Sequence, residues 1–145
     1  KLCAVAEQGG NNLPAGWYDL QQKRLDNFFD AMGMLQAERT MPEKQLLMRQ
    51  RYLVRIDHGG LFIPEVGVEA LSTIVEGGSV LGRVVDPHAN EVIQTIRAPY
   101  EESAILMMRT GMTRVNPGDY GYIISDAGTG EWIDPPTDWK FPGAR

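Results

Sequence analysis

The stretch Val75-Glu-Gly-Gly-Ser-Val-Leu-Gly-Arg-Val-Val-Asp86 has an internal counterpart 40 residues later, Val115-Asn-Pro-Gly-Asp-Tyr-Gly-Tyr-Ile-Ile-Ser-Asp126. In each copy a turn precedes an apolar strand, and Gly78 aligns with Gly118. Glycine tolerates the positive φ that such turns require. Two half-units that cannot bury their apolar faces alone are expected to pack against each other. The pattern therefore predicts a mainly β, pseudo-two-fold barrel-sandwich domain over residues 45–126.

Further strands are expected before and between the two copies. Alternation from Tyr52 to Ile56 predicts one strand, and Leu61 to Ile63 predicts a second. Between the copies, a hairpin turn at 86–91 leads into a strand at 92–97, and another strand is expected at 104–109. The prolines and glycines after residue 126 predict an irregular tail over 127–145.

The first 36 residues have a different character. Leu2 to Ala6 is a short apolar run that predicts a buried strand, and a glycine-rich loop follows it. A helix is expected next, with Asp19 as its N-cap and Gly33 at its end. A single strand does not cover the apolar face of that helix. Residues 1–36 are therefore interpreted as the last strand and helix of an incomplete α/β domain.

Composition narrows the classes of function. The chain has 145 residues, enough for one ordinary domain or two very small ones, and a net charge of −5, which argues against nucleic acid as a partner. No apolar run is long enough to span a bilayer, so no membrane association is expected. The lone Cys3 forms no internal disulfide, which fits a cytoplasmic location. A chain that starts Lys1-Leu-Cys-Ala-Val is expected to be a piece of a longer or processed protein.

Turn–strand repeats of this kind resemble biotinyl and lipoyl carrier domains, which carry their cofactor on a lysine at the tip of the central hairpin. The corresponding hairpin here, Asp86 to Glu91, has no lysine. The lysines of the chain are Lys1, Lys23, Lys44 and Lys140, so the predicted β domain has none. We therefore expect the architecture of a carrier without its function.

A broader set of motifs resembles the C-terminal part of the succinylglutamate desuccinylase/aspartoacylase family. The set begins with Ala6-Glu7-Gln8-Gly9-Gly10, continues with the helix that ends Phe28-Phe29-Asp30-Ala31-Met32-Gly33-Met34-Leu35, and ends with Gly60-Leu61-Phe62, the Val75 to Val84 segment, Ala98-Pro99 and Pro117-Gly118-Asp119. The order and spacing of the motifs carry the resemblance, which covers residues 2–126. It implies a zinc-dependent hydrolase with a carboxypeptidase-like α/β domain followed by a β-rich domain. Such an enzyme removes an acyl group from a small N-acyl amino acid-like substrate.

By that resemblance, Glu7 matches the family's catalytic glutamate, the general base for the zinc-activated water. The alternative is a surface glutamate at a strand end. The family's zinc ligands, a His-x-x-Glu motif and a later histidine, precede the glutamate, so we expect the zinc ligands upstream of this chain and none within it. The formal match His88-Ala-Asn-Glu91 lies downstream on a predicted hairpin and is interpreted as ordinary turn residues. Cys3 is expected to be a core residue.

Two functions remain open from the sequence. The first is the C-terminal segment of a zinc-dependent deacylase, inactive by itself. The second is a non-catalytic interaction or scaffolding module. The arginines of the β domain are either contacts for an acidic substrate or ordinary surface charges, and they are Arg83, Arg97, Arg109 and Arg114. The apolar face of the predicted helix favours a homo-oligomer.

Overall fold

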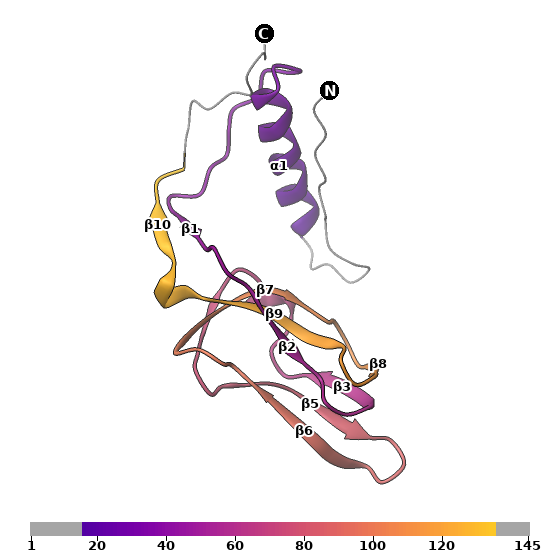
Figure 1. Cartoon of the computed structure of the whole chain (residues 1–145). Helices are drawn as coiled ribbons and strands as arrows, with labels where there is room; N and C mark the ends of the chain where they lie inside the picture. The colour runs from indigo at the N-terminus through magenta and orange to yellow at the C-terminus, as the bar shows by residue number, and fades with distance from the viewer. Residues whose placement is uncertain (1–15, 136–145) are drawn as a thin grey trace. The chain divides into compact units, whose positions relative to one another are not determined.

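The computed structural model describes residues 16–135 of the chain (Figure 1). The chain divides into two compact units, which are described separately. One unit comprises residues 46–132 and is called the β unit. The other comprises residues 1–45 and 133–145, and its described part is called the helical unit. The predicted strand from Leu2 to Ala6 and the residue Glu7 lie outside the described residues.

The helical unit contains one helix, α1 (Trp17–Ala31), and the segment 32–44 that follows it, which is called the connector. The helix was expected to begin after an Asp19 N-cap, but its N-cap is Gly16, which makes no side-chain capping bond, so Asp19 falls in the first turn. At the other end, Gly33 takes φ +70°, and its N–H donates to the carbonyl of Asp30, as expected for a glycine that terminates a helix. Among the described residues, no helix has both the length and the apolar character needed to cross a membrane.

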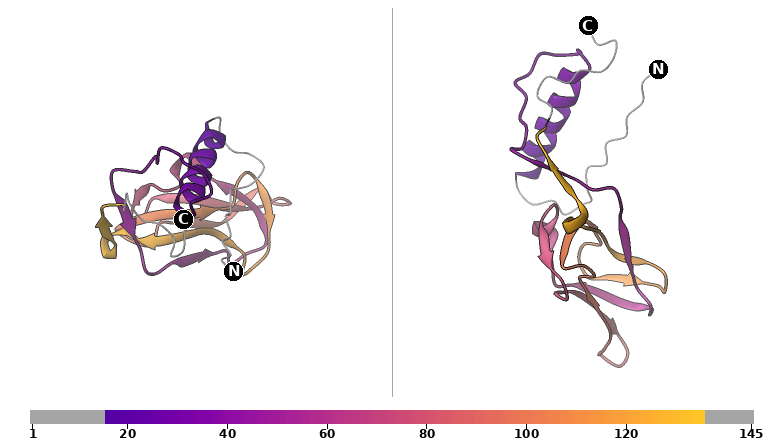
Figure 2. Two further views of the ribbon diagram at one scale, coloured as in Figure 1. Left: turned by 90° about the horizontal axis from the view of Figure 1, so that it is seen from above. Right: turned by 60° about the vertical axis from the view of Figure 1, so that its left-hand side comes forward.

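The first sheet of the β unit has the order β2-β9-β7-β4, and every neighbouring pair is antiparallel. Its strands are β2 (Tyr52–Arg55), β9 (Tyr120–Asp126), β7 (Glu102–Met108) and β4 (Ile74–Glu76). β9 lies between β2 and β7 and is hydrogen-bonded to both. Figure 2 shows the strands of the β unit from two further directions.

The second sheet has the order β6-β5-β3-β8 and is also antiparallel throughout. Its strands are β6 (Glu91–Arg97), β5 (Val80–Asp86), β3 (Gly60–Pro64) and β8 (Thr113–Val115). These eight strands form two separate four-stranded sheets, and the described strands form no closed barrel. The domain is therefore mainly β, as expected.

The two sheets are related by a simple exchange of strands. If β2, β3, β4 and β5 are replaced by β6, β7, β8 and β9, and the reverse, the order of the first sheet becomes the order of the second. The same exchange relates the sequence copies, because β4-turn-β5 and β8-turn-β9 are 40 residues apart. The echo in the sequence therefore has a counterpart in the topology.

The aligned turn glycines have the backbone conformation that the pattern predicts. Gly78 has φ +78° and Gly118 has φ +91°, a region that other L-residues rarely adopt. A Cβ added at either position would meet nothing within 4 Å. These positions therefore require glycine for backbone conformation alone and not for space.

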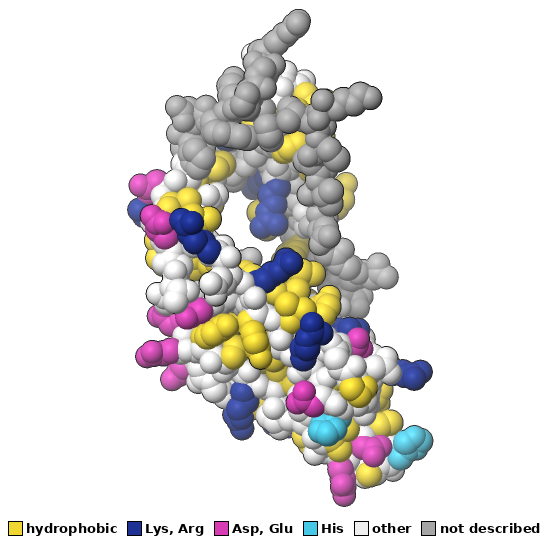
Figure 3. Space-filling view, in the orientation of Figure 1, with side chains coloured by type: hydrophobic (Ala, Val, Ile, Leu, Met, Phe, Trp, Pro, Cys, Tyr) yellow, Lys and Arg dark blue, Asp and Glu magenta, His cyan; other side chains and the backbone are white. Residues whose placement is uncertain are grey.

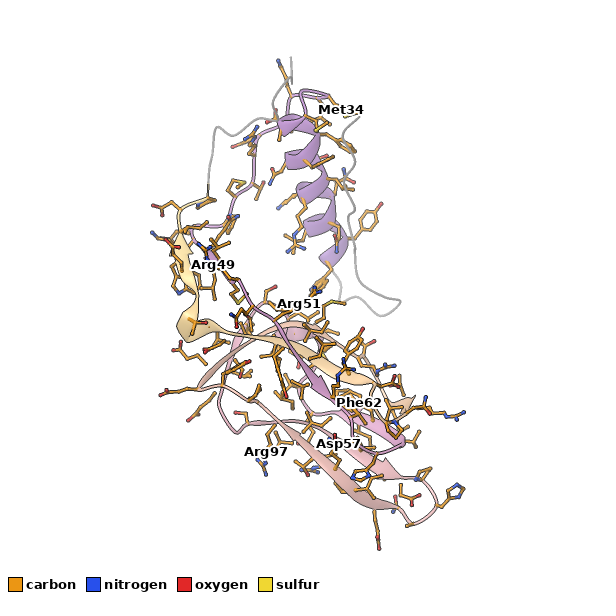
Figure 4. All side chains as sticks on the ribbon, in the orientation of Figure 1. Met34, Arg49, Arg51, Asp57, Phe62 and Arg97 are labelled. Atoms are coloured by element: carbon orange, nitrogen blue, oxygen red, sulfur yellow. The ribbon has the colours of Figure 1, made fainter. Side chains whose placement is uncertain are left out.

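The core of the β unit lies between the two sheets and draws on both. Phe62 of β3 and Tyr122 of β9 are fully buried and meet edge to face, with ring centroids 5.9 Å apart (Figure 4 labels Phe62). Glycine makes room for the Phe62 ring, because a Cβ on Gly82 would lie 2.8 Å from Phe62 Cε2. The other buried apolar residues of this cluster are Val54, Ile56, Leu81, Val84, Ile96, Ala98, Ile105, Val115 and Ile124.

One part of the tail differs from the irregular structure expected for 127–145. A 3₁₀ turn, η2 (Ala127–Thr129), leads into β10 (Glu131–Ile133), which pairs with β1 (Gln45–Leu47). A second 3₁₀ turn, η1 (Val68–Ala70), lies between β3 and β4. Pro135 follows β10, so it does not interrupt the backbone hydrogen bonding of that strand. Residues 136–145 are outside the description.

The backbone requirement at the turns gives a direct test. We expect Gly118→Ala to lower the free energy of unfolding by about 1–2 kcal/mol, because alanine is strained at this φ. Gly59→Ala is the matched control, since Gly59 lacks a positive φ and an added Cβ would find only contacts of 3.6 Å. Chemical denaturation of both variants measures the difference, and equal stabilities would contradict the assignment.

A second test concerns a buried hydroxyl. Thr113 Oγ1 is buried and has no hydrogen-bond partner among the described residues. We expect Thr113→Val to raise the free energy of unfolding by about 1 kcal/mol, because the valine removes a polar group that is desolvated without compensation. Thr113→Ser keeps the hydroxyl and loses the methyl group, so it should be destabilising. A loss of stability in Thr113→Val would show that the hydroxyl does have a partner.

Candidate functional site

The candidate catalytic residue, Glu7, belongs by sequence to the helical unit but lies outside the described residues. The described residues of that unit form α1 and the connector. Two polar contacts hold them together. The Asn27 amide donates to the Thr40 carbonyl at 2.7 Å and accepts from the Thr40 N–H at 2.9 Å. Arg39 Nε donates to Asp30 Oδ2 at 2.6 Å in a largely buried ion pair.

A groove runs between α1 and the connector in the helical unit. It is mainly apolar, and its basic residues are Lys23, Arg24 and Arg39. The remaining residues along it are Leu20, Asn27, Phe28, Ala31, Thr40, Met41, Pro42 and Gln45. None of these is a histidine, a cysteine or a carboxylate. The described walls of the groove therefore supply no general base and no metal ligand of those types.

The described residues do not assemble a metal site. Across residues 16–135 there is no group of three or more His, Cys, Asp or Glu side chains that could hold an ion. Figure 3 shows the two histidines of the chain near acidic side chains at one end of the β unit. His88 lies in the β5–β6 turn, where its N–H donates to Asp86 Oδ1 at 2.8 Å. The described residues therefore do not fit zinc, and His88 and Glu91 lie where the sequence predicted, on a hairpin.

From the sequence, a carrier lysine would be expected at this same turn if the chain were a carrier. The turn joins β5 to β6 at the Asp86–Glu91 pair, in the middle of the eight strands of the two sheets. Asn90 takes φ +55° and donates its N–H to the Asp86 carbonyl, which closes the turn. No lysine occurs anywhere between residues 46 and 132. The β unit therefore has no amine that could be acylated at this hairpin or elsewhere along its chain.

Most of the four arginines have partners within the protein. Arg83 forms an ion pair with Glu65 at 2.9 Å, and Arg97 donates to the Gly78 carbonyl at 2.8 Å. Arg109 lies over the Tyr120 ring, donates to the Tyr120 carbonyl and is 3.7 Å from Asp119. These residues are dispersed over β5, β6 and the segment after β7. They do not converge on one anion site.

Tyr122 is the one polar residue of the core cluster. Its hydroxyl lies 2.5 Å from the Leu81 carbonyl oxygen and 3.0 Å from that of Val66, and it donates to one of them at a time. Burial raises the pKa of the phenol well above its ordinary value, more than the Val66 hydrogen bond lowers it. The hydroxyl therefore serves as a hydrogen-bond donor inside the core. In the sequence, the signal of its burial is its place in the apolar strand segment Tyr120 to Ile124.

The sequence was also compared with known proteins. No protein-family model and no curated protein matches the chain.

The Tyr122 hydroxyl can be tested through its pH dependence. We expect Tyr122→Phe to lower the free energy of unfolding by about 1 kcal/mol at neutral pH. Because the folded-state pKa is raised, this contribution is present below the pKa of an unfolded tyrosine, about 10, and declines above it. The stability difference between wild type and Tyr122→Phe should therefore shrink as the pH rises beyond that value.

Chemical denaturation at a series of pH values measures this difference. Tyr52→Phe is the control. Tyr52 is half exposed and its ring contacts Tyr100, but its hydroxyl forms no hydrogen bond among the described residues. We expect that variant to match wild type at every pH. A constant gap between Tyr122→Phe and wild type across the alkaline range would contradict a buried neutral phenol.

Proposed function

We propose that this chain is the C-terminal part of a zinc-dependent amidohydrolase of the succinylglutamate desuccinylase/aspartoacylase type. The observation that carries the proposal is the order of its motifs, from Glu7-x-Gly9-Gly10 through the Phe28 to Leu35 segment to Pro117-Gly118-Asp119. The described helix covers the first part of the second motif, and the later motifs lie on and between strands of the β unit. The parent enzyme would act on a small N-acyl amino acid-like substrate in the cytoplasm.

A barrel-sandwich architecture for the β unit is part of this proposal. Two observations support it. The strand exchange converts one sheet order into the other, and Gly78 and Gly118 take the same left-handed conformation at equivalent turns. In the family that the chain resembles, a β-rich domain follows the catalytic domain. Here the β unit follows the α1 segment in the same order.

In this proposal Glu7 is the general base. Its carboxylate would accept a proton from the water that attacks the amide carbonyl and would then deliver that proton to the leaving nitrogen. Gly9 and Gly10 would allow the backbone beside it to approach the substrate closely. The described residues do not supply a zinc site. Residues that precede Glu7 in a longer protein would have to provide one, so no step is assigned to the metal.

The structure also favours a second candidate, a non-catalytic interaction module. The β unit has a buried core of its own, formed between its two sheets. Its described residues include neither a metal-binding group nor a lysine at the central hairpin. The sequence upstream of Lys1 in the natural product separates the two candidates. A His-x-x-Glu motif followed by another histidine decides for the hydrolase, and the absence of both decides for the module.

The catalytic role of Glu7 is testable in the longer protein that the proposal implies. We expect Glu7→Gln to reduce kcat for release of the acyl group at least about 100-fold, because glutamine cannot accept the proton. Bound zinc should be unchanged, which metal analysis of the purified variant measures. Glu43→Gln, at an exposed glutamate of the connector, is the matched control and should retain full turnover. Full turnover by Glu7→Gln would refute the role, and the 145-residue chain alone should show no deacylation.

A further inference from the structure

The groove of the helical unit has one wall formed by a single stripe of α1. The helix residues of this wall are Leu20, Lys23, Arg24, Asn27, Phe28 and Ala31. They recur at helical spacing, which places them on one face of the helix over a length of roughly 16 Å. The opposite wall is the part of the connector from Arg39 to Pro42, and Gln45 lies beyond it. The groove is therefore long enough to hold an extended segment of several residues.

The residues of this groove make more contacts than those between α1 and the connector. Phe28 meets Phe29 edge to face, with ring centroids 5.8 Å apart, and Arg39 forms its ion pair with Asp30. Phe28, Asp30 and Arg39 each take part in a further interaction besides these. Two of the three, Phe28 and Arg39, line the groove. The groove therefore has contacts that α1 and the connector do not account for.

The chain returns to the helical unit beside this groove. Lys44 Nζ lies 2.6 Å from Asp134 Oδ1, and the next residue, Gln45, lines the groove. Such an exposed ion pair adds little stability, but it shows where the chain re-enters the unit. Residues 133–145 belong to the same compact unit as α1 and the connector. The segment that follows Asp134 therefore starts at one end of the groove.

The sequence of that segment suits an apolar groove. It reads Pro135-Pro-Thr-Asp-Trp-Lys-Phe-Pro142. Proline favours an extended backbone for the residue before it, so Phe141 is biased towards an extended conformation. In an extended chain, residues two apart point to the same side, so Trp139 and Phe141 would face one way. The segment thus offers two large aromatic side chains to one surface.

The segment is also long enough to reach the groove. Trp139 is five residues beyond Asp134, which allows a span of up to roughly 17 Å. Met41 is three residues from Lys44, so the two are at most roughly 11 Å apart along the connector. Trp139 can therefore reach the groove from the Lys44–Asp134 ion pair without any rearrangement of the connector.

We propose that residues 136–145 of the same chain occupy this groove, with the Trp139 and Phe141 side chains against Phe28 and the connector. Burial of two aromatic side chains against the apolar stripe of α1 favours this arrangement. A tethered segment also has a high effective concentration at the groove, which a second molecule lacks. The inference does not depend on the proposed function.

The fluorescence of Trp139 tests the proposal in the full chain. Trp17→Phe/Trp132→Phe leaves Trp139 as the only tryptophan, and Trp17→Phe/Trp139→Phe leaves Trp132, which is 60% exposed. Trp139 should emit at a shorter wavelength than Trp132, and acrylamide should quench it several-fold less. Both results should be independent of protein concentration. Emission and quenching equal to those of Trp132 would overturn the proposal, and so would burial that appears only as the concentration rises, which would assign the groove to a second copy.

Variants of the two walls locate the burial. In the chain with Trp139 alone, Phe28→Ala and Met41→Gln should each move the emission to longer wavelength and raise quenching towards the level of Trp132. Phe28→Leu keeps an apolar wall and should retain most of the protection. Phe29→Ala is the matched control, because Phe29 is the adjacent phenylalanine and does not line the groove.

Circular dichroism identifies the variants that retain α1, and Met41→Gln leaves the sequence of the helix unchanged if Phe28→Ala loses its helical signal. Two results would contradict the proposal. One is a folded Phe28→Ala or Met41→Gln chain in which Trp139 stays as protected as before. The other is a Phe29→Ala chain in which Trp139 becomes as exposed as in Phe28→Ala.

Discussion

The β unit depends on how the Tyr122 side chain is accommodated between its two sheets. The ring lies against Phe62 from the opposite sheet, and the hydroxyl reaches carbonyl oxygens at Leu81 and Val66. Leu81 lies in β5 and Val66 follows β3, so one side chain of β9 makes polar contact with two segments of the other sheet. A buried phenol without such partners would cost free energy. The hydrogen bonds of the Tyr122 hydroxyl therefore favour the one arrangement of the sheets in which Tyr122 faces Leu81 and Phe62.

Glycine provides the space that this arrangement needs. The Phe62 ring lies so close to the backbone of β5 and β9 that a Cβ on Gly82 or Gly121 would approach it to 2.8 or 3.3 Å. The positions are nearly equivalent in the two sequence copies, in which Leu81-Gly82 aligns with Gly121-Tyr122. Large and small residues thus exchange places between the copies. This exchange lets two similar halves interdigitate, whereas two identical large residues would collide.

Much of the β unit was predictable from local chemistry. The turn glycines require a positive φ, and the segment Asp86 to Glu91 has the composition of a hairpin turn, so both features followed from short stretches of sequence.

Other features of the fold depend on contacts between residues that are distant in the sequence. β10 pairs with β1, which is distant in the sequence, and the hydroxyl of the buried Ser125 is compensated by its hydrogen bond to the Gln50 carbonyl. The start of α1 was misplaced because Gly16 caps it without a side-chain bond, whereas Asp19 has the residue type of a cap. The Glu7 assignment rests on family resemblance and lies outside the described residues.

The exchange of strands between the sheets has a consequence for the order in which the chain acquires structure. β2 is synthesised before the other seven strands of the two sheets, yet its only described partner in the sheet is β9, which is the last of these eight strands to leave a ribosome. Until β9 emerges, β2 and β7 lack the strand that joins them. The nascent chain therefore exposes open strand edges from the synthesis of β2 until the synthesis of β9, and this is the interval in which a chaperone would protect it from aggregation.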